Sequence, residues 1–285
     1  MLVPTFARGP PPPPDGAPRN NMAGLPRIGQ PGLFFRDRCA RLRQSAAMFR
    51  LSDDGAVARL TLDRPQTRNA IPAAGWAELE RLIGTVGDGD ARLLIVAGEG
   101  GAFCAGADLS DFPALRDDEA ARIRFREGMR AALDALAALP IPTIALIEGP
   151  CYGAGVALAL ACDLRIAGAE ARFAITPAKI GISYPQEDVH RLVGAVGPGQ
   201  ASRLLFTARS IDAAEALRIG LADLAEHEGL IEAILANDRA SLASLKRAIA
   251  LAGEGRRTDA GQDRRFDALI AGEEMARRLE ALGRK

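Results

Sequence analysis

Residues 148–157 read EGPCYGAGVA and directly follow the apolar run TIALI at residues 143–147. A second segment rich in glycine and alanine, GAFCAGADL at residues 101–109, comes shortly after the apolar run of residues 93–96. Small side chains where a strand passes into a helix let a ligand approach the backbone, and the free N–H groups of a first helical turn attract negative charge. Either segment alone can be a tight turn, but their joint occurrence favours a site for a phosphate or an oxyanion.

Short apolar strands and amphipathic helices alternate around these two segments. We expect strands over residues 56–62, 93–96, 143–147, 164–166 and 172–175. We expect helices over residues 73–85, 118–138, 154–161, 199–205 and 213–218 and, beyond residue 220, over residues 231–251 and 262–282. This alternation predicts an α/β core over residues 48–225 with helices covering the strands, followed by a helical region over residues 226–285.

Residues 1–47 differ from the rest of the chain in composition. They contain nine of the 18 prolines, five of them in a row at residues 10–14, so we expect a disordered tail. Translation that starts at Met22 or Met48 is an alternative explanation of this stretch. The N-terminus lacks the pattern of a secretory signal, and no apolar run reaches the ~18 residues that span a bilayer. We therefore expect a cytoplasmic protein.

The overall composition argues against several kinds of site. The chain has 36 basic and 36 acidic residues and no net charge at pH 7, so bulk electrostatics give it no attraction to nucleic acid or to an anionic membrane. Four cysteines without a C-x-x-C pair and only two histidines argue against a metal site. A Walker-type phosphate loop is absent, and residues 153–155 lack the third glycine of a dinucleotide-binding motif. Cys104 and Cys151 have no histidine beside them in the sequence and are expected to be packing residues.

Three motifs together give the chain a resemblance to a known family. They are LDRPQTRNA at residues 62–70, AFCAGADL at residues 102–109, and the segment of residues 149–161 with its continuation CDLRIA. In this combination the chain resembles the crotonase superfamily of enoyl-CoA hydratases and isomerases over residues 48–250. The resemblance implies a crotonase-like spiral of β-β-α turns with a C-terminal helical region, a homotrimer or dimer of trimers, and an acyl-CoA thioester as substrate.

The resemblance also implies individual site residues. In this superfamily two backbone N–H groups hold the thioester oxygen, and they correspond to Ala107 and Ala154. Prepositioned donors contribute about 3–4 kcal/mol each where an oxygen gains charge in the transition state. Arg68 corresponds to a position that meets CoA phosphates, while Ala105 and Leu109 flank the path of the adenine and pantetheine groups. No cofactor is implied beyond the CoA moiety of the substrate.

Two positions in the CoA-binding motifs have alternatives that the residues leave open. Arg68 can equally be a solvated surface arginine, since any exposed guanidinium group has the same affinity for phosphate. Asp108 lies in the same CoA-binding segment as Ala105 and Leu109. Its residue type favours capping of a following helix over a role as a base.

The chain departs from the family pattern at both catalytic glutamates. These would fall at Ala157 and Pro177, and neither side chain exchanges a proton, so the two-glutamate hydration mechanism is lost. The best-placed substitutes are Glu187 and Asp188, which alternatively cap the start of a helix. Tyr184, just before them, orients a substrate oxygen or fills the pocket wall.

We therefore expect an acyl-CoA enzyme of the enoyl-CoA hydratase/isomerase type. It would be a lyase or isomerase of fatty-acid or other acyl-CoA metabolism, and it would stabilise a thioester enolate in a backbone oxyanion hole. Two alternatives stay open: a divergent enzyme that acts as a decarboxylase or thioester hydrolase, and a non-catalytic acyl-CoA-binding or assembly subunit.

Overall fold

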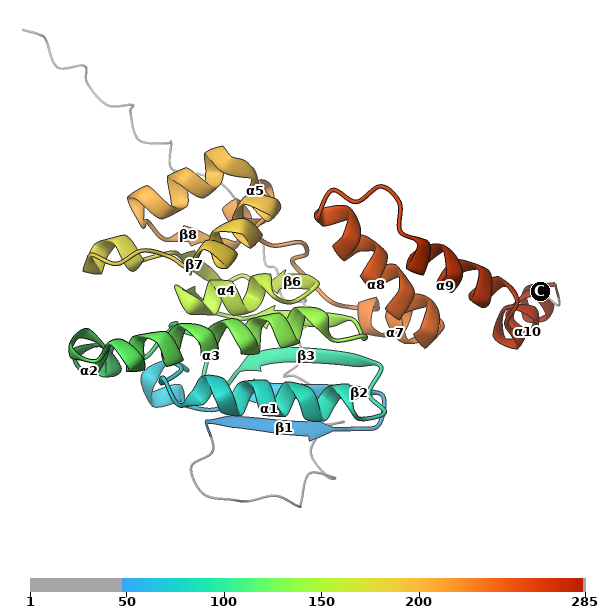
Figure 1. Cartoon of the computed structure of the whole chain (residues 1–285), viewed down its shortest axis with the longest axis horizontal. Coiled ribbons are helices and arrows are strands. Elements are labelled where there is room, and N and C mark those ends of the chain that lie inside the picture. The colour runs from blue at the N-terminus through green and yellow to red at the C-terminus, as the bar shows by residue number, and fades with distance from the viewer. Residues whose placement is uncertain (1–47, 284–285) are drawn as a thin grey trace, which may run out of the picture. The chain divides into compact units, whose positions relative to one another are not determined.

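A computed structural model of the chain describes residues 48–283 (Figure 1). The tail expected over residues 1–47 lies outside the described residues, as do residues 284 and 285. The described residues all belong to one unit, Gln44–Lys285, as defined by its internal contacts. The division of this unit into a core of residues 48–225 and a helical region of residues 226–285 stays a prediction.

The larger sheet of the described chain has five strands in the order β1-β2-β3-β4-β6. In the register of this sheet, β1 runs antiparallel to β2 and the other pairs are parallel, with Ile95 beside Ile144 at the centre. The two central strands, β3 and β4, are almost wholly buried, which explains their continuous apolar sequences. The strands are β1 (Phe49–Asp53), β2 (Val57–Leu62), β3 (Leu93–Gly98), β4 (Thr143–Ile147) and β6 (Leu164–Ala167).

A smaller sheet follows the larger one in the chain, because β4 leads directly into its first strand. Its strands, in order, are β5 (Pro150–Tyr152), β7 (Arg172–Ala174) and β8 (Ile211–Asp212). β5 pairs in parallel with β7, and β7 pairs in antiparallel with β8. Only Glu148 and Gly149 separate β4 from β5, so the EGPCYGAGVA segment begins where the chain passes between the two sheets.

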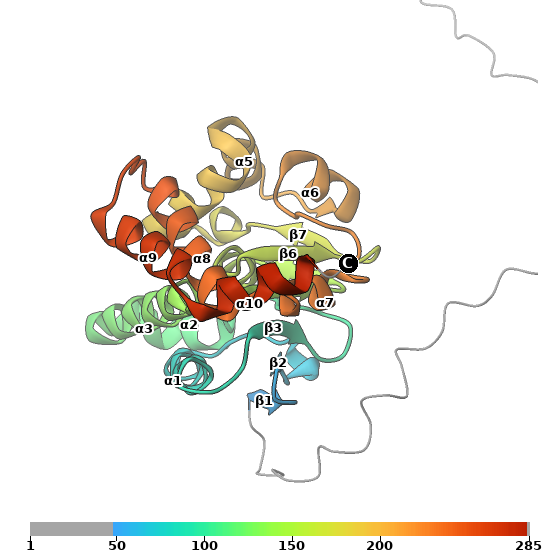
Figure 2. The same cartoon turned by 90° about the vertical axis from the view of Figure 1, so that its right-hand side faces the viewer.

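Two long helices cover one face of the larger sheet. α1 (Gly75–Gly87) and α3 (Glu119–Ala138) pack against each other, and Figure 1 shows them side by side in front of the strands. Figure 2 places both helices on the same side of β2 and β3. Their buried side chains recur every three or four residues, as expected of a helix with one apolar face, and join the main core: Trp76, Leu79, Ile83, Met129, Leu133 and Leu136.

Two further helices, α4 and α5, each follow a strand of the smaller sheet in the sequence. α4 (Ala154–Leu160) is buried along its whole length because all of its side chains are small or apolar. α5 (Gln186–Thr207) is kinked at Gly197, where φ is +74° and ψ is 162°, directly before Pro198. Proline lacks the N–H that would continue the helical hydrogen-bond ladder, so a kink is expected there.

The end of the described chain is helical, as expected, but its helices are shorter than the pattern predicts. The interval of residues 231–251 is interrupted at Asp238, whose side chain accepts a hydrogen bond from the N–H of Ser241 and caps the next helix. The interval of residues 262–282 is interrupted at Gly272. The helices are α6 (Ala213–Ile219), α7 (Leu230–Leu235), α8 (Arg239–Gly253), α9 (Ala260–Ile270) and α10 (Glu273–Leu282). Over residues 48–283 none of the helices combines the length and the apolar composition needed to cross a membrane.

The α/β class is confirmed, and the differences from the expected elements have physical reasons. β1 escapes prediction because it is an edge strand in which only Phe49 is buried, so it has no continuous apolar pattern. The helix expected from residue 199 begins at Gln186, because Gly197 and Pro198 break the pattern without ending the helix. Short elements also go unpredicted: the strands β5 and β8, α2 (Phe112–Asp117) and the 3₁₀ helices η1 (Pro65–Thr67), η2 (Leu109–Asp111) and η3 (Pro177–Ile180).

Candidate active site

The two segments rich in glycine and alanine lie side by side. The N–H groups of Phe103 and Cys104 donate to the carbonyl of Pro150 at 3.0 and 3.1 Å. The N–H of Tyr152 donates to the carbonyl of Cys104 at 2.8 Å, which makes an isolated parallel bridge between Cys104 and Cys151. The first segment is therefore held against β5, next to the start of α4.

Glycine is required at the closest contacts between the two segments. A β-carbon at Gly149 would lie 2.0 Å from the carbonyl oxygen of Gly101, and a β-carbon at Gly155 would lie 2.4 Å from that of Cys104. Such distances are far inside van der Waals contact, and the opposing atoms belong to the backbone. The glycines of both motifs thus serve the close approach of two chain segments.

The amide groups of Ala107 and Ala154 come close together at this junction. A β-carbon at Gly106 would lie 3.1 Å from the amide nitrogen of Ala154, so the peptide that joins Gly106 to Ala107 lies next to the first residue of α4. Ala107 forms a bridge with Ile71, but that bridge uses the N–H groups of Ile71 and Asp108. Ala154 opens its helix and therefore has no helical acceptor for its N–H. Within residues 48–283 no backbone or side-chain acceptor takes up either alanine N–H.

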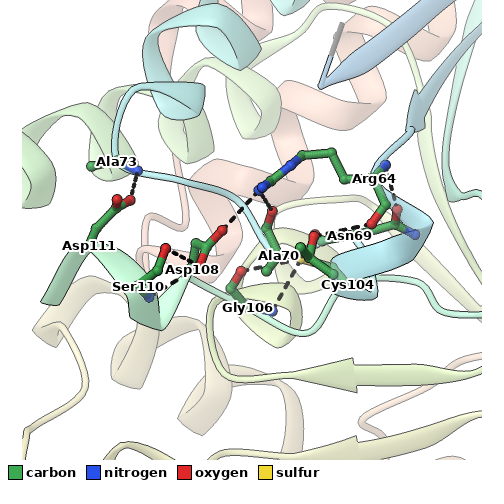
Figure 3. A network of polar contacts seen from close by, with 10 residues as sticks. Arg64, Asn69, Ala70, Ala73, Cys104, Gly106, Asp108, Ser110 and Asp111 are labelled. Atoms are coloured by element: carbon green, nitrogen blue, oxygen red, sulfur yellow. Dashed lines mark hydrogen bonds and ion pairs between the residues drawn. The ribbon is translucent and has the colours of Figure 1, made fainter. Parts of the chain in front are cut away.

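Asn69 fixes the loop that leads into the first segment (Figure 3). Its side chain is 1% exposed, and its oxygen accepts from the N–H of Arg64 at 2.9 Å. Its Nδ2 donates to the carbonyls of Glu99 and Ala102 at 2.9 and 2.7 Å. The φ of Asn69 is +60°, in the left-handed region that asparagine tolerates better than most residues. Asn69 thus ties the end of β2 to the end of β3.

Arg64 and Asp108 form a partly buried ion pair in the same network (Figure 3). Arg64 Nη1 donates to Asp108 Oδ2 at 3.0 Å and to the carbonyl of Ala70 at 2.7 Å. Asp108 also accepts from the N–H and the hydroxyl of Ser110, at 3.2 and 2.8 Å, and so caps η2. These hydrogen bonds from Ser110, with the contribution of Arg64, hold the pKa of Asp108 below its ordinary value. The capping role favoured by the sequence is confirmed.

Two of the positions implied for CoA binding are in direct contact. The N–H of Ala105 donates to the carbonyl of Arg68 at 2.9 Å. Arg68 is exposed, and no carboxylate or carbonyl in the described part of the chain pairs with its guanidinium group. Leu109, which opens η2, is 57% exposed. The arrangement leaves the charge of Arg68 free to meet a ligand.

The two carboxylates at the start of α5 have different surroundings. Glu187 pairs with Arg130 of α3, and its side chain is 35% exposed. Asp188 is only 2% exposed and pairs with Arg191 at 3.3 Å. Both carboxylates lie in the first turn of α5, where the helix dipole favours negative charge, as the helix-capping interpretation expects. Pro185 is the N-terminal cap, however, and neither carboxylate accepts a capping hydrogen bond from a backbone N–H within residues 48–283.

Asp188 titrates closer to neutrality than an ordinary carboxylate. Burial raises its pKa to about 6, against the opposing attraction of Arg191. Arg191 is shared with Asp134 of α3, whose like charge also raises the pKa of Asp188. Glu187 instead faces an open depression of about 380 Å³, which it lines with Asp134, Gln186, His190 and Arg191.

The sequence and fold of the chain are shared with known proteins. Residues 52–260 match the model of the enoyl-CoA hydratase/isomerase family. The chain belongs to this family. A probable enoyl-CoA hydratase of Mycobacterium bovis, echA6, is 36% identical over 176 residues, which cover 62% of this chain and 70% of the relative. A probable mitochondrial enoyl-CoA hydratase of Arabidopsis thaliana is 34% identical over 223 residues, which cover 74% of this chain and 73% of the relative.

A solved structure of the same family confirms the fold. An enoyl-CoA hydratase/carnithine racemase from Magnetospirillum magneticum superimposes on this chain with a TM-score of 0.79 at 28% identity. The superposition covers 84% of this chain and 93% of that structure. The crotonase-like α/β fold with its C-terminal helical region is therefore confirmed.

A tyrosine hydroxyl lies near the position expected for the first glutamate of the enoyl-CoA hydratase/isomerase family. That position is Ala157, which is fully buried in α4, and the second is Pro177, which begins η3. The hydroxyl of Tyr184 donates to the carbonyl of Gly153 at 3.0 Å and lies close to the amide of Ala157. Its ring is buried in the main core.

The buried cysteines of this family member are packing residues, as the sequence predicts for Cys104 and Cys151. These two and Cys162 are at most 4% exposed. Burial raises the pKa of Cys104 and Cys162 to about 12 and that of Cys151 well above its ordinary value, so their thiols stay protonated. Over residues 48–283 no group of three His, Cys, Asp or Glu side chains is placed to hold a metal ion.

Sequence reasoning misses the roles of Arg64, Asn69 and Arg191. Asn69 offers a usable signal, because asparagine in the turn between a strand and a helix is typical of a left-handed φ. Arg64 offers none: its partner Asp108 is 44 residues away, and such a pairing leaves no local pattern. Arg191 likewise reaches Asp134, 57 residues before it.

Proposed function

We propose that this chain is an acyl-CoA enzyme that stabilises a thioester enolate between the N–H groups of Ala107 and Ala154. The observation that carries the proposal is that both N–H groups lie at one junction and have no acceptor among the described residues. An enolate oxygen carries negative charge, and each prepositioned donor stabilises it by about 3–4 kcal/mol. The descriptions of its relatives as enoyl-CoA hydratases support a CoA thioester as substrate. The reaction would be that of a lyase or isomerase in fatty-acid or other acyl-CoA metabolism.

Asp188 is the group that we assign to proton transfer. Its charge acts on the hydroxyl of Tyr184, which reaches the carbonyl directly before Ala154, so Asp188 belongs to the same buried cluster as the proposed oxyanion donor. A proton-transfer group works best when its pKa lies near the operating pH, and burial brings Asp188 into that range. Glu187 is the weaker candidate because Arg130 holds it toward α3 and the open depression.

Asp188→Asn is expected to lower kcat by about 10²–10⁴-fold, because the amide cannot take up the α-proton of the thioester. Glu187→Gln, the neighbouring control, should retain kcat within about threefold. The kcat of the wild type should rise as the pH increases through about 6 and then level off, because the raised pKa keeps Asp188 protonated and inactive below that value. Turnover of a panel of CoA thioesters of increasing acyl length, measured between pH 5 and 9, checks this. Equal losses in the two variants would contradict the assignment.

A non-catalytic acyl-CoA-binding or assembly subunit is the second candidate function, favoured by the alanine and proline at positions 157 and 177. Both functions require binding, so a saturating CoA thioester should raise the melting temperature. A thioester that raises it without being turned over favours the binding subunit, whereas no rise across the panel contradicts both functions. Release of carbon dioxide from a malonyl-type thioester, or of free CoA thiol, would instead identify a decarboxylase or a thioester hydrolase.

Arg68→Ala is expected to weaken the binding of CoA thioesters about tenfold, because a charge-assisted contact with phosphate is lost. The difference from wild type should shrink at high salt, since the contact lies near the surface. Arg81→Ala replaces an exposed arginine of α1 and should change the affinity less than twofold. Calorimetric titration at two salt concentrations measures both variants. Equal affinities would make Arg68 a solvated surface arginine.

We propose further that the chain assembles as a homotrimer or dimer of trimers through its C-terminal helices. Large apolar side chains exposed on one chain favour a protein–protein contact, and α8, α9 and α10 expose Leu245, Ile249, Phe266, Ile270, Leu279 and Leu282. A cytoplasmic location, no cofactor beyond the CoA moiety, and no nucleic-acid or membrane partner complete the proposal.

A further inference from the structure

Tyr184 touches the peptide group that joins Gly153 to Ala154. The carbonyl of this peptide belongs to Gly153 and its N–H to Ala154, so the two groups turn together. The hydroxyl of Tyr184 donates to that carbonyl at 3.0 Å. The same oxygen accepts from the N–H groups of Val156 and Ala157 at 2.9 and 3.3 Å. Three donors from two segments of the chain therefore determine which way the N–H of Ala154 points.

Gly153 itself adds little restraint to this peptide. Gly153 has a φ of +51° and a ψ of −119°, a conformation that side-chain-bearing residues rarely adopt. Nothing lies within 4 Å of the point where its β-carbon would be, so no packed side chain restrains it there. Its own N–H donates to the carbonyl of Ala174 in β7 at 2.9 Å. The donors to the Gly153 carbonyl, together with the burial of α4, thus set the orientation of the next peptide.

The surroundings of Tyr184 keep its hydroxyl in the form that donates. The residue is 8% exposed and packs in the main core, so its ring has little freedom to move. Burial, together with the nearby charge of Asp188, raises the pKa of Tyr184 well above its ordinary value. The hydroxyl therefore stays protonated.

We infer that Tyr184 is a positioning residue, which orients and polarises the Gly153–Ala154 peptide so that the Ala154 N–H donates to the enolate oxygen. A carbonyl that accepts a hydrogen bond makes the N–H of the same peptide a stronger donor. The inference rests on the proposed function and deepens it, because it adds a side chain to an oxyanion site made of main-chain groups.

Acetoacetyl-CoA is a suitable probe, because this β-keto thioester ionises without an enzymic base and its enolate absorbs in the near ultraviolet. At a fixed pH the wild type should bind it with a larger fraction of enolate than the free ligand has. Tyr184→Phe keeps the ring and removes the hydroxyl. We expect it to lower the enolate-to-keto ratio of the bound ligand about fivefold, while the affinity for hexanoyl-CoA changes about twofold or less.

Two further variants complete the test. Thr85→Val removes another hydroxyl that donates to a backbone carbonyl, that of Arg81 in α1 at 3.1 Å, and should leave the ratio at the wild-type value. Tyr184→3-fluorotyrosine keeps the shape and strengthens the donor, so it should raise the ratio even if Tyr184→Phe melts too low to be measured.

The outcomes distinguish failure of the positioning role of Tyr184 from failure of the proposed function. If the wild type raises the enolate fraction but Tyr184→Phe or Tyr184→3-fluorotyrosine gives the same ratio, the positioning role is overturned and the proposed function stands. If the wild type does not raise the enolate fraction, the oxyanion site fails and the inference fails with it.

Discussion

Ala154→Pro is expected to lower kcat by about 10²–10³-fold, because it removes one of the two N–H groups proposed to donate to the enolate oxygen. Ala154 is the first residue of α4, a helical position at which proline is tolerated because its missing N–H has no helical acceptor. KM should change much less than kcat, since the donor acts mainly on charge that develops in the transition state. Steady-state kinetics on the thioester with the highest turnover in the panel measure both constants.

Ala260→Pro is the matched control for this variant. Ala260 opens α9 in the same way, is exposed, and lies in the C-terminal helical part of the chain. It should leave kcat unchanged, and melting curves of both variants report on folding. Replacing the Ala154 residue by L-lactate, which turns the N–H into an ester oxygen without adding a ring, should reproduce the loss. Wild-type kcat in a folded Ala154→Pro variant would remove Ala154 from the mechanism.

Gly149→Ala is expected to lower the free energy of unfolding by about 3 kcal/mol or more. Its β-carbon would lie 2.0 Å from the carbonyl oxygen of Gly101, so the two segments that build the site would have to separate. The position of a β-carbon is set by its own backbone and the opposing oxygen belongs to the backbone of Gly101, so no side-chain rotation relieves the contact. Urea denaturation measures the loss, and the variant should also lose turnover because Ala107 and Ala154 move apart.

Gly84→Ala provides the comparison for the glycine substitution. Gly84 lies in α1, is exposed, and has nothing within 4 Å of its missing β-carbon. Alanine there should raise the free energy of unfolding by about 0.5–1 kcal/mol, because glycine is a poor helix former. A loss below about 1 kcal/mol in Gly149→Ala would contradict the close approach of the two segments.

The elements next to the site are the ones that the sequence predicts best. β4 covers residues 143–147 as expected, and α4 begins at Ala154 as expected. Both are buried, so their sequences are almost wholly apolar, and Gly149 and Gly153 mark the turns that follow β4 and precede α4. β1 and the first half of α5 are not predicted, because an edge strand needs few apolar residues and a helix can continue through a Gly-Pro kink.

The residues of the candidate site also differ in how well the sequence predicts them. Those in short motifs are predicted, whereas contacts between residues far apart in the sequence are not. The proposed donors Ala107 and Ala154 lie in motifs that can be read from short segments of sequence. The hydroxyl of Tyr184 meets the carbonyl of Gly153 across 31 residues, and no spacing rule connects them. The burial of Asp188 is equally hidden, because the sequence around it, QEDVHRL, has the composition of an exposed helix start.

The donors proposed at the junction of the two segments, the N–H groups of Ala107 and Ala154, belong to the main chain. This has a consequence for how such enzymes can change their reaction. Every residue except proline has a backbone N–H group, so the donor is kept as long as the path of the chain is kept. The surrounding side chains are therefore free to vary. The proposed oxyanion donors therefore do not depend on an acid at positions 157 and 177, where this chain has alanine and proline. With such main-chain donors in place, a new reaction would require only an acid or base positioned beside the junction of the two segments.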